Sequence, residues 1–161
     1  MRHITLSTCG IVPKIYELAN LHLGITLSVS LHAPNDEIRS NTMPINNKYK
    51  IDELLKACRE YGLKTGRRVS FEYTLIKDVN DSSENALELA SRLKGMNAHV
   101  NLIPVNDVKE RGNVKSSKKA ILNFQNILKK SGINATIRRT LGSDINASCG
   151  QLRRLKNRGE I

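Results

Sequence analysis

Runs of β-forming residues alternate with stretches of helical periodicity along nearly the whole of this 161-residue chain. The runs predicted to be strands cover residues 2–7, 25–31, 69–76, 100–103 and 136–139. The stretches predicted to be helices cover residues 13–20, 51–61, 81–94 and 118–130. Such alternation is typical of parallel β/α units joined by right-handed crossovers. The sequence therefore predicts an α/β fold with a parallel sheet.

Some segments carry more specific expectations. The polar segment after the second strand is bounded by prolines, and we expect it to be a loop as far as Asn47. Gly62 is expected near the end of the second helix. Residues 81–84 have the form of a capping box, and Leu87 and Ala90 are expected to face inward from the helix that this box opens.

The chain is strongly basic, with a formal net charge of +11 and a pI of about 9.8. This charge favours nucleic acid or another polyanion as a partner, although an inert basic surface would have the same composition. No apolar run approaches the length of a membrane span, and the N-terminus does not resemble a secretory signal. We therefore expect a cytoplasmic protein with no membrane partner.

The three cysteines, Cys9, Cys58 and Cys149, form no paired framework. An odd number of cysteines in a chain without a signal sequence indicates a reduced, intracellular protein. Cys58 shares a helical face with Leu54 and Leu55, so it is expected in the core. No C-x-x-C pair or H-x-x-x-H spacing is present, and local motifs therefore provide no metal site.

Polar side chains follow the predicted strands at the points where the strands end. They are Ser7, Ser30, His32, Asn106 and Cys149. In parallel sheets the carboxyl ends of the strands meet at one edge, where chemistry gathers. A single histidine is more often a structural hydrogen-bonding group than a ligand contact. The convergence of five polar groups is the stronger indication of a site at this edge.

Cys149 lies between small residues, beside Gly150, after the basic run that contains Arg138 and Arg139. Small neighbours leave the sulfur accessible, and nearby positive charge favours the thiolate. A buried cysteine that behaves as a small hydrophobic residue is the alternative. The residues alone leave both interpretations open.

Five short motifs, in order along nearly the whole chain, resemble the radical S-adenosylmethionine (SAM) RNA methyltransferases. They are STCGIVP (7–13), SLHAPND (30–36), PIN (44–46), NLIPVN (101–106) and ASCGQL (147–152). The resemblance is greatest to the bacterial enzymes that methylate carbon 2 of adenine in large-subunit ribosomal RNA and, in some bacteria, in transfer RNA. It implies a partial, TIM-like barrel of parallel β/α units that holds SAM at the carboxyl ends of the strands.

The resemblance also implies a role for each matching residue. Cys149 matches the cysteine that accepts a methyl group from one SAM molecule. A second SAM is cleaved reductively, its deoxyadenosyl radical removes hydrogen from the S-methyl group, and the methylene radical attacks the adenine. The protein's part is placement of the reacting groups. Positions that match SAM contacts are Ser7, Ser30, Leu31, His32 and Asn106.

The chain departs from the family pattern because the C-x-x-x-C-x-x-C motif, which holds a 4Fe–4S cluster, is absent. We expect residues 1–161 to be the C-terminal portion of such an enzyme, ending in a basic flexible tail over 153–161. The cluster and a reducing electron donor are then expected only in a full-length enzyme, and the chain alone is expected to be inactive. An incomplete barrel is also expected to expose a hydrophobic edge at 2–7.

Three alternatives stay open. The first is the sister enzyme that methylates carbon 8 of the same adenine, since it shares the cysteine and the SAM contacts. The second is an inactive basic RNA-binding fragment. Its support is the charge of +11 and a basic loop with Lys109, Arg111, Lys115, Lys118 and Lys119. The third is an α/β domain with a structural cysteine, which leaves the polar strand ends unexplained.

Overall fold

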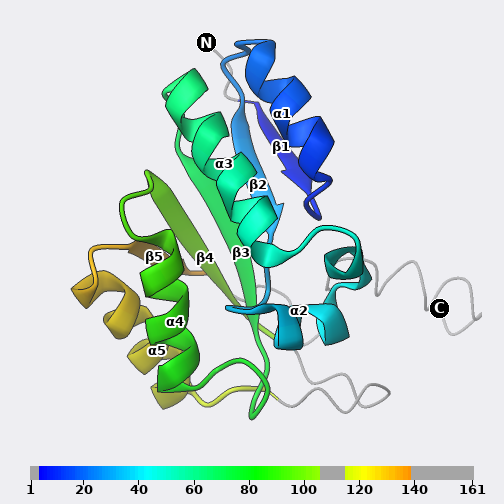
Figure 1. The fold of residues 1–161 in the computed structure, drawn as a ribbon. Helices are drawn as coiled ribbons and strands as arrows, with labels where there is room; N and C mark the ends of the chain where they lie inside the picture. The colour runs from blue at the N-terminus through cyan, green and yellow to red at the C-terminus, as the bar shows by residue number, and fades with distance from the viewer. Residues whose placement is uncertain (1–3, 106–114, 139–161) are drawn as a thin grey trace, which may run out of the picture.

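The structure, a computed structural model, describes residues 4–105 and 115–138 and contains one five-stranded sheet (Figure 1). All the paired strands are parallel, and their order in the sheet is their order in the chain. The strands are β1 (Thr5–Thr8), β2 (Thr26–Ser30), β3 (Val69–Leu75), β4 (Ala98–Pro104) and β5 (Asn134–Ile137). The predicted α/β class with a parallel sheet is confirmed.

The four longer helices described here cover a single face of the sheet, as Figure 1 shows. They are α1 (Val12–Asn20), α3 (Ile51–Thr65), α4 (Ser83–Leu93) and α5 (Lys118–Lys130). Crossovers of one hand place every helix on the same side when the strand order never reverses. A doubly wound sheet reverses its order and carries helices on both faces. The sequential order is that of the β/α units of a barrel.

The hydrophobic core lies between the sheet and these helices. Alternate residues of β3, which are Val69, Phe71, Tyr73 and Leu75, point into the core and are at most 1% exposed. The ring of Tyr73 packs on Phe124 of α5 with centroids 5.1 Å apart. Each fully buried large apolar side chain stabilises the fold by about 1.5–3 kcal/mol. The residues between them face away from the helices, where the sheet is polar.

The prediction of a loop as far as Asn47 was wrong. A short helix, α2 (Asp36–Thr42), and a 3-10 turn, η1 (Pro44–Asn47), occupy this segment. The Asn35 side chain caps α2 by accepting from the backbone N–H of Ile38 at 3.0 Å. Polar contacts, rather than hydrophobic packing, hold α2 in place. The segment therefore lacks the apolar stripe by which a helix is predicted from sequence.

Two further expectations about the helices were wrong. Helix α3 continues past Gly62 to Thr65, and its C-cap is Gly66, whose φ of +64° lies in the left-handed region. In α4 the capping box pairs Ser82 with Asn85, one position later than predicted. Ala90 faces inward as predicted, but Leu87 does not: it is 57% exposed, and Leu89 is buried instead.

Strand β1 forms one edge of the sheet, and its apolar residues are poorly covered. Leu6 pairs with the core residue Leu27, so it lies on the helical side of the sheet, yet it is 40% exposed. Ile4, just before the strand, is 60% exposed. These residues confirm the expected hydrophobic edge. Among the described residues, no helix combines the length and hydrophobicity needed to cross a membrane.

Candidate functional site

The face of the sheet that turns away from the helices is lined by polar side chains. In the central strands they alternate with the core residues, as the period of two in a strand requires. They are Ser28, Ser30, Ser70, Glu72, Thr74, His99, Asn101 and, on β5, Thr136. A largely polar sheet face opposite a largely apolar one suits a bound polar ligand better than a second hydrophobic layer.

Glu72 lies at the centre of this face, on the middle strand. Its neighbours in register are Ser30 on β2 and Asn101 on β4. The Ser28 hydroxyl donates to Oε1 at 3.1 Å, and Asn101 Nδ2 donates to Oε2 at 2.8 Å. The backbone carbonyl of Glu72 accepts from the N–H groups of Leu31 and His32 at 3.0 and 3.2 Å. Glu72 therefore holds the end of β2 through its backbone and lines the face with its carboxylate.

His99 occupies the amino-terminal part of the same face. Its Nδ1 lies 3.2 Å from the Ser70 hydroxyl, and its Nε2 lies 3.0 Å from the Thr136 hydroxyl. Burial lowers the pKa of His99, and the nearby Arg68 lowers it further, against an opposing effect of Glu72. Both ring nitrogens are engaged with protein groups, so His99 has a structural role in linking β3, β4 and β5.

His32 directly follows β2 and has a left-handed backbone with φ of +57°. Its Nδ1 accepts from the backbone N–H of Thr74 at 3.0 Å, and its carbonyl accepts from Asn80 Nδ2 at 2.8 Å. Burial, reinforced by the positive charge of Arg39, lowers the pKa of His32 from 6.5 to about 4. The ring is therefore neutral near pH 7. Because Nδ1 accepts a hydrogen bond, we assign the ring proton to Nε2, which can donate to a ligand.

We expect the free energy of unfolding to fall as the pH is lowered from 6.5 to 4. The unfolded chain protonates His32 near pH 6.5, but the folded chain does so only near pH 4. Stability is therefore present above pH 6.5 and is lost as the pH approaches 4. We expect the free energy of unfolding to fall by about 2 kcal/mol. This is less than the full pKa difference would give, because solvent partly screens the half-buried ring.

Urea unfolding between pH 4 and 7.5 measures this loss, and His32→Asn is the control. Asparagine tolerates the left-handed backbone and does not titrate. The variant should therefore lose about 2 kcal/mol less stability over this range than the unaltered chain, while acidic groups such as Asp36 contribute equally to both. Equal pH dependence in the two proteins would contradict the assignment to His32.

Arg39 of α2 is fully buried and joins the ends of the first two strands. Its Nη2 donates to the carbonyls of Cys9 at 2.8 Å and Ser30 at 3.2 Å, and its Nε donates to the carbonyl of Leu31 at 3.2 Å. Its Nη1 donates to Asn46 Oδ1 at 3.2 Å. Burial lowers the pKa of Arg39. Carbonyl oxygens, rather than a carboxylate, thus satisfy this cation, and they fix the loops that carry the candidate residues.

The loop after β1 leaves no room beside Arg39. A Cβ atom at Gly10 would lie 2.9 Å from the methyl groups of Leu54 and 3.5 Å from Nη2 of Arg39. Gly10 also has a φ of +104°, which side chains rarely adopt. Glycine is therefore required here for the loop to approach both α3 and the buried guanidinium.

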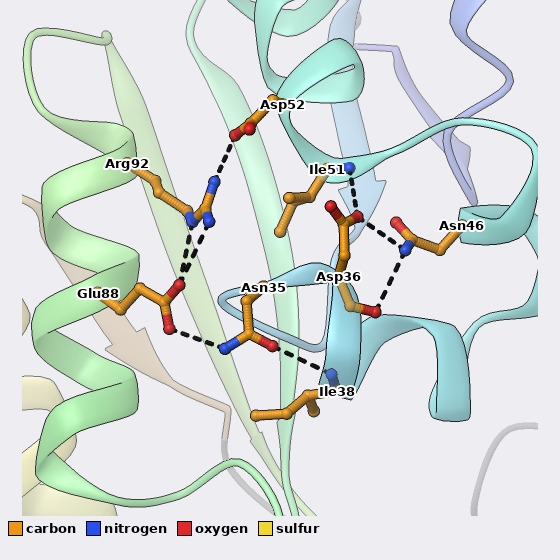
Figure 2. A network of polar contacts seen from close by, with 8 residues as sticks. All are labelled: Asn35, Asp36, Ile38, Asn46, Ile51, Asp52, Glu88 and Arg92. Carbon is orange, nitrogen blue, oxygen red and sulfur yellow. Dashed lines mark hydrogen bonds and ion pairs between the residues drawn. The ribbon is translucent and has the colours of Figure 1, made fainter.

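Asp36 and Asn46 link α2 to η1 and α3 (Figure 2). Asn46 Nδ2 donates to Asp36 Oδ1 at 2.8 Å, and the same oxygen accepts from the backbone N–H of Ile51 at 2.9 Å. Burial alone would raise the pKa of Asp36, but the hydrogen bonds from Ile51 and Asn46 outweigh it and the pKa is lowered. The charged carboxylate therefore anchors the start of α3 to α2.

A second polar chain in Figure 2 reaches α4. Asn35 Nδ2 donates to Glu88 Oε2 at 2.8 Å, and Arg92 Nη2 donates to Glu88 Oε1 at 3.3 Å. Arg92 Nη1 also contacts the Asp52 carboxylate. The segment after β2 is therefore held by α3 and by α4, which gives the carboxyl end of β2 a defined position.

The structure brings some of the predicted site residues together. Ser7 pairs in register with Ser28, so Ser7 and Ser30 lie on the same polar face, and His32 lies just beyond it. The Leu31 side chain is buried in the core on the other face, and its backbone N–H and C=O bond to Glu72 and Arg39. Asn106 and Cys149 lie outside the described residues, as does the predicted tail over 153–161.

Sequence reasoning missed three residues that organise this region: Arg39, Glu72 and Asn80. Asn80 is fully buried; its Nδ2 donates to His32 O and Thr74 O, both at 2.8 Å, and its Oδ1 accepts from Ile76 N–H at 2.7 Å. A charged residue inside a β-pattern was the available signal for Glu72. Arg39 and Asn80 bond chiefly to backbone groups, which leave no sequence pattern.

The described cysteines do not fit an iron–sulfur cluster. Cys58 is buried on the helical side of the sheet, where burial raises the pKa of its thiol to about 12. Cys9 is exposed in the loop after β1. Across residues 4–105 and 115–138, no three His, Cys, Asp or Glu side chains are arranged to hold a metal ion.

The sequence matches a known family. Residues 1–90 match the Radical SAM superfamily model, and the chain belongs to that superfamily. The probable dual-specificity RNA methyltransferase RlmN of Clostridium botulinum (strain Eklund 17B / Type B) is 64% identical over 153 residues. That alignment covers 95% of this chain and 44% of the relative. The chain therefore spans less than half the length of this curated relative.

Two solved structures resemble the fold. The crystal structure of a radical SAM methyltransferase from Sphaerobacter thermophilus matches with a TM-score of 0.87 and 51% identity, over 92% of this chain and 43% of that one. A domain of pyruvate-formate lyase-activating enzyme from Bacteroides vulgatus matches with a TM-score of 0.67 over 85% of this chain and 81% of that one. Its identity is 17%, so it supports the fold alone. The expected incomplete TIM-like barrel of β/α units is thus confirmed.

Proposed function

We propose that this chain is part of a radical SAM RNA methyltransferase that methylates carbon 2 of adenine in large-subunit ribosomal RNA and in transfer RNA. One observation carries the proposal: the identity of 64% to a relative named as a dual-specificity RNA methyltransferase extends over 95% of the chain. The net charge of +11 suits an RNA substrate. We further propose that the enzyme works in the cytoplasm with a reducing electron donor.

The polar face has the donor and acceptor groups that SAM requires. When bound, SAM supplies the methyl group and, on reductive cleavage, the adenosyl radical of this enzyme class. We propose that the hydroxyls of Ser7 and Ser30 and the Nε2–H of neutral His32 bind it, together with Asn106. Leu31 contributes through its backbone, which the carbonyl of Glu72 and the guanidinium of Arg39 hold in position. Among the described residues, the fit rests on the exposed or half-buried polar groups of Ser7, Ser30 and His32, at or just beyond the carboxyl ends of β1 and β2.

We propose that Cys149 accepts the methyl group and presents it to the adenine. In the sequence it follows β5, the last strand that the structure describes, and its neighbours Ser148 and Gly150 are small. Enzymes that modify a base take it out of its stack, so the carrier must reach both cofactor and base. The described residues provide no ligand set for a 4Fe–4S cluster.

The product nucleoside tests the proposal. The chain would be joined to the preceding region of the Clostridium botulinum relative, reconstituted without oxygen, and incubated with SAM, a reductant and large-subunit ribosomal RNA. We expect 2-methyladenosine in the digested RNA by mass spectrometry, and also in transfer RNA. If 8-methyladenosine forms instead, the chain is part of the sister enzyme that methylates carbon 8 of adenine. RNA that stays unmethylated by a folded, cluster-loaded protein would exclude the methyltransferase function.

A further inference from the structure

We propose that Glu72 binds the ribose of SAM, with its carboxylate accepting hydrogen bonds from the 2′- and 3′-hydroxyls. This inference rests on the proposed function, because it assigns a further binding residue to the same cofactor. Glu72 is the one charged residue in the five described strands, and it lies beside Ser30 at the end of β2. Neither the sequence motifs nor the resemblance pointed to this residue.

Among the described residues, no cation pairs with the negative charge of Glu72. In the part of the chain that the structure describes, no lysine, arginine or histidine nitrogen lies within ion-pair distance of the carboxylate. The side chain is half-buried on a face whose other polar groups, among the described residues, are neutral hydroxyls, amides and imidazole. Removing a carboxylate from water is unfavourable unless hydrogen bonds compensate. Two donors, from Ser28 and Asn101, provide only part of that compensation.

The two existing hydrogen bonds also orient the carboxylate. Ser28 on β2 donates to Oε1, and Asn101 on β4 donates to Oε2, so the group is held from both flanking strands. Each oxygen of a carboxylate has a further lone pair, and a carboxylate accepts only. Its ligand must therefore present hydrogen-bond donors. A pair of adjacent hydroxyls matches two fixed oxygens, and acidic residues commonly recognise ribose hydroxyls in nucleotide sites.

Binding measurements with Glu72→Gln test the inference without any enzymatic turnover. Isothermal titration calorimetry would compare SAM with 5′-methylthioadenosine, which retains the ribose and adenine but lacks the ammonium group. We expect Glu72→Gln to weaken both ligands by about ten- to a hundredfold, as loss of a charged acceptor does. A loss confined to SAM would place the carboxylate against a cationic group of SAM, the ammonium or the sulfonium, and overturn the ribose assignment. Unchanged affinity for both ligands would also overturn it.

A comparison of 5′-deoxyadenosine with its 2′- and 3′-deoxy analogues isolates the hydroxyls. Removing a hydroxyl should weaken binding to the unaltered chain and change little in Glu72→Gln, because the partner is already lost. If Glu72 had a purely structural role, removing a hydroxyl would weaken binding by the same factor in the unaltered chain and in Glu72→Gln. Equal factors in the two proteins therefore exclude the ribose contact.

Two further variants serve as controls. Ser70→Ala lies on the same strand and face, two residues earlier, where its hydroxyl contacts His99. We expect it to leave SAM affinity unchanged, and circular dichroism should show native structure for every variant. Asn101→Ala should weaken SAM binding by a few-fold, because it frees one carboxylate oxygen to move. If the unaltered chain binds neither SAM nor 5′-methylthioadenosine, the proposed cofactor site fails, and the role of Glu72 fails with it.

Discussion

Replacing Arg39 with alanine is expected to lower the free energy of unfolding by about 3–5 kcal/mol, as other losses of a buried charged partner do. The substitution leaves the carbonyls of Cys9, Ser30 and Leu31 without their donor in a site that excludes water. It also opens a cavity between α2 and the sheet. The loops that carry Ser30 and His32 should lose their fixed position, so SAM binding should weaken as well. Urea unfolding followed by circular dichroism measures the change.

Two variants make the Arg39 experiment decisive. Arg39→Lys keeps the charge but cannot reproduce the planar fork that reaches three carbonyls, so we expect an intermediate loss of stability. It also provides a folded protein for measurement if Arg39→Ala does not fold. Arg68→Ala removes an exposed arginine and should change stability by at most about 0.5 kcal/mol. A loss below about 1 kcal/mol for Arg39→Ala would show that the buried guanidinium is dispensable.

Replacing Cys149 with alanine is expected to abolish RNA methylation by the joined protein, while Cys58→Ala leaves the activity intact. The proposed carrier needs a thiolate that can reach the cofactor. Cys58 cannot serve, because it is fully buried on the helical side of the sheet and its pKa is raised to about 12. Its replacement should cost about 1 kcal/mol of stability through the lost packing. The measurements are nucleoside mass spectrometry of the RNA and urea unfolding of each variant.

Cys9 is the competing candidate for the methyl carrier. It is exposed and follows β1, at the end of the sheet where the proposed SAM contacts lie. However, its carbonyl accepts a hydrogen bond from Arg39, and Gly10 packs against α3. The loop therefore has little freedom to swing toward an RNA base. Peptide mass spectrometry of the isolated enzyme should find the S-methyl group on the peptide that contains Cys149. A methyl group on Cys9, or full turnover by Cys149→Ala, would refute the assignment.

The sequence analysis was most accurate for elements that are stabilised by residues close together in the sequence. The limits of α5 were correct, since Ser117 caps its start and an apolar stripe runs through Ile121, Phe124 and Leu128. Helix α2 was missed because polar contacts hold it: Arg39 bonds to the carbonyl of Cys9 in another segment, and Asn46 bonds to Asp36. Apart from the start of β3 at Val69, the limits of the strands were misplaced by one to three residues, because pairing with neighbours, rather than composition, decides where a strand stops.

The candidate site was predictable where it depends on strand ends. Ser7 and Ser30 were identified because a parallel sheet brings the carboxyl ends of its strands together, and the register places both on one face. The part that was missed depends on tertiary contacts. Arg39 bonds mainly to backbone carbonyls, and Glu72 is noticeable only once Ser28 and Asn101 are seen on either side of it.

The sequential order of the strands has a consequence for how the chain folds during synthesis. Each strand from β2 to β5 pairs with the strand made just before it. A chain that leaves the ribosome can therefore extend the sheet by one β/α unit at a time, and no strand has to insert between two that are already paired. Each pairing still closes a long loop, since Thr5 pairs with Thr26 and Leu27 pairs with Val69, and parallel pairings of this kind form slowly. The order of assembly from β1 to β5 is thus expected to follow the order of translation.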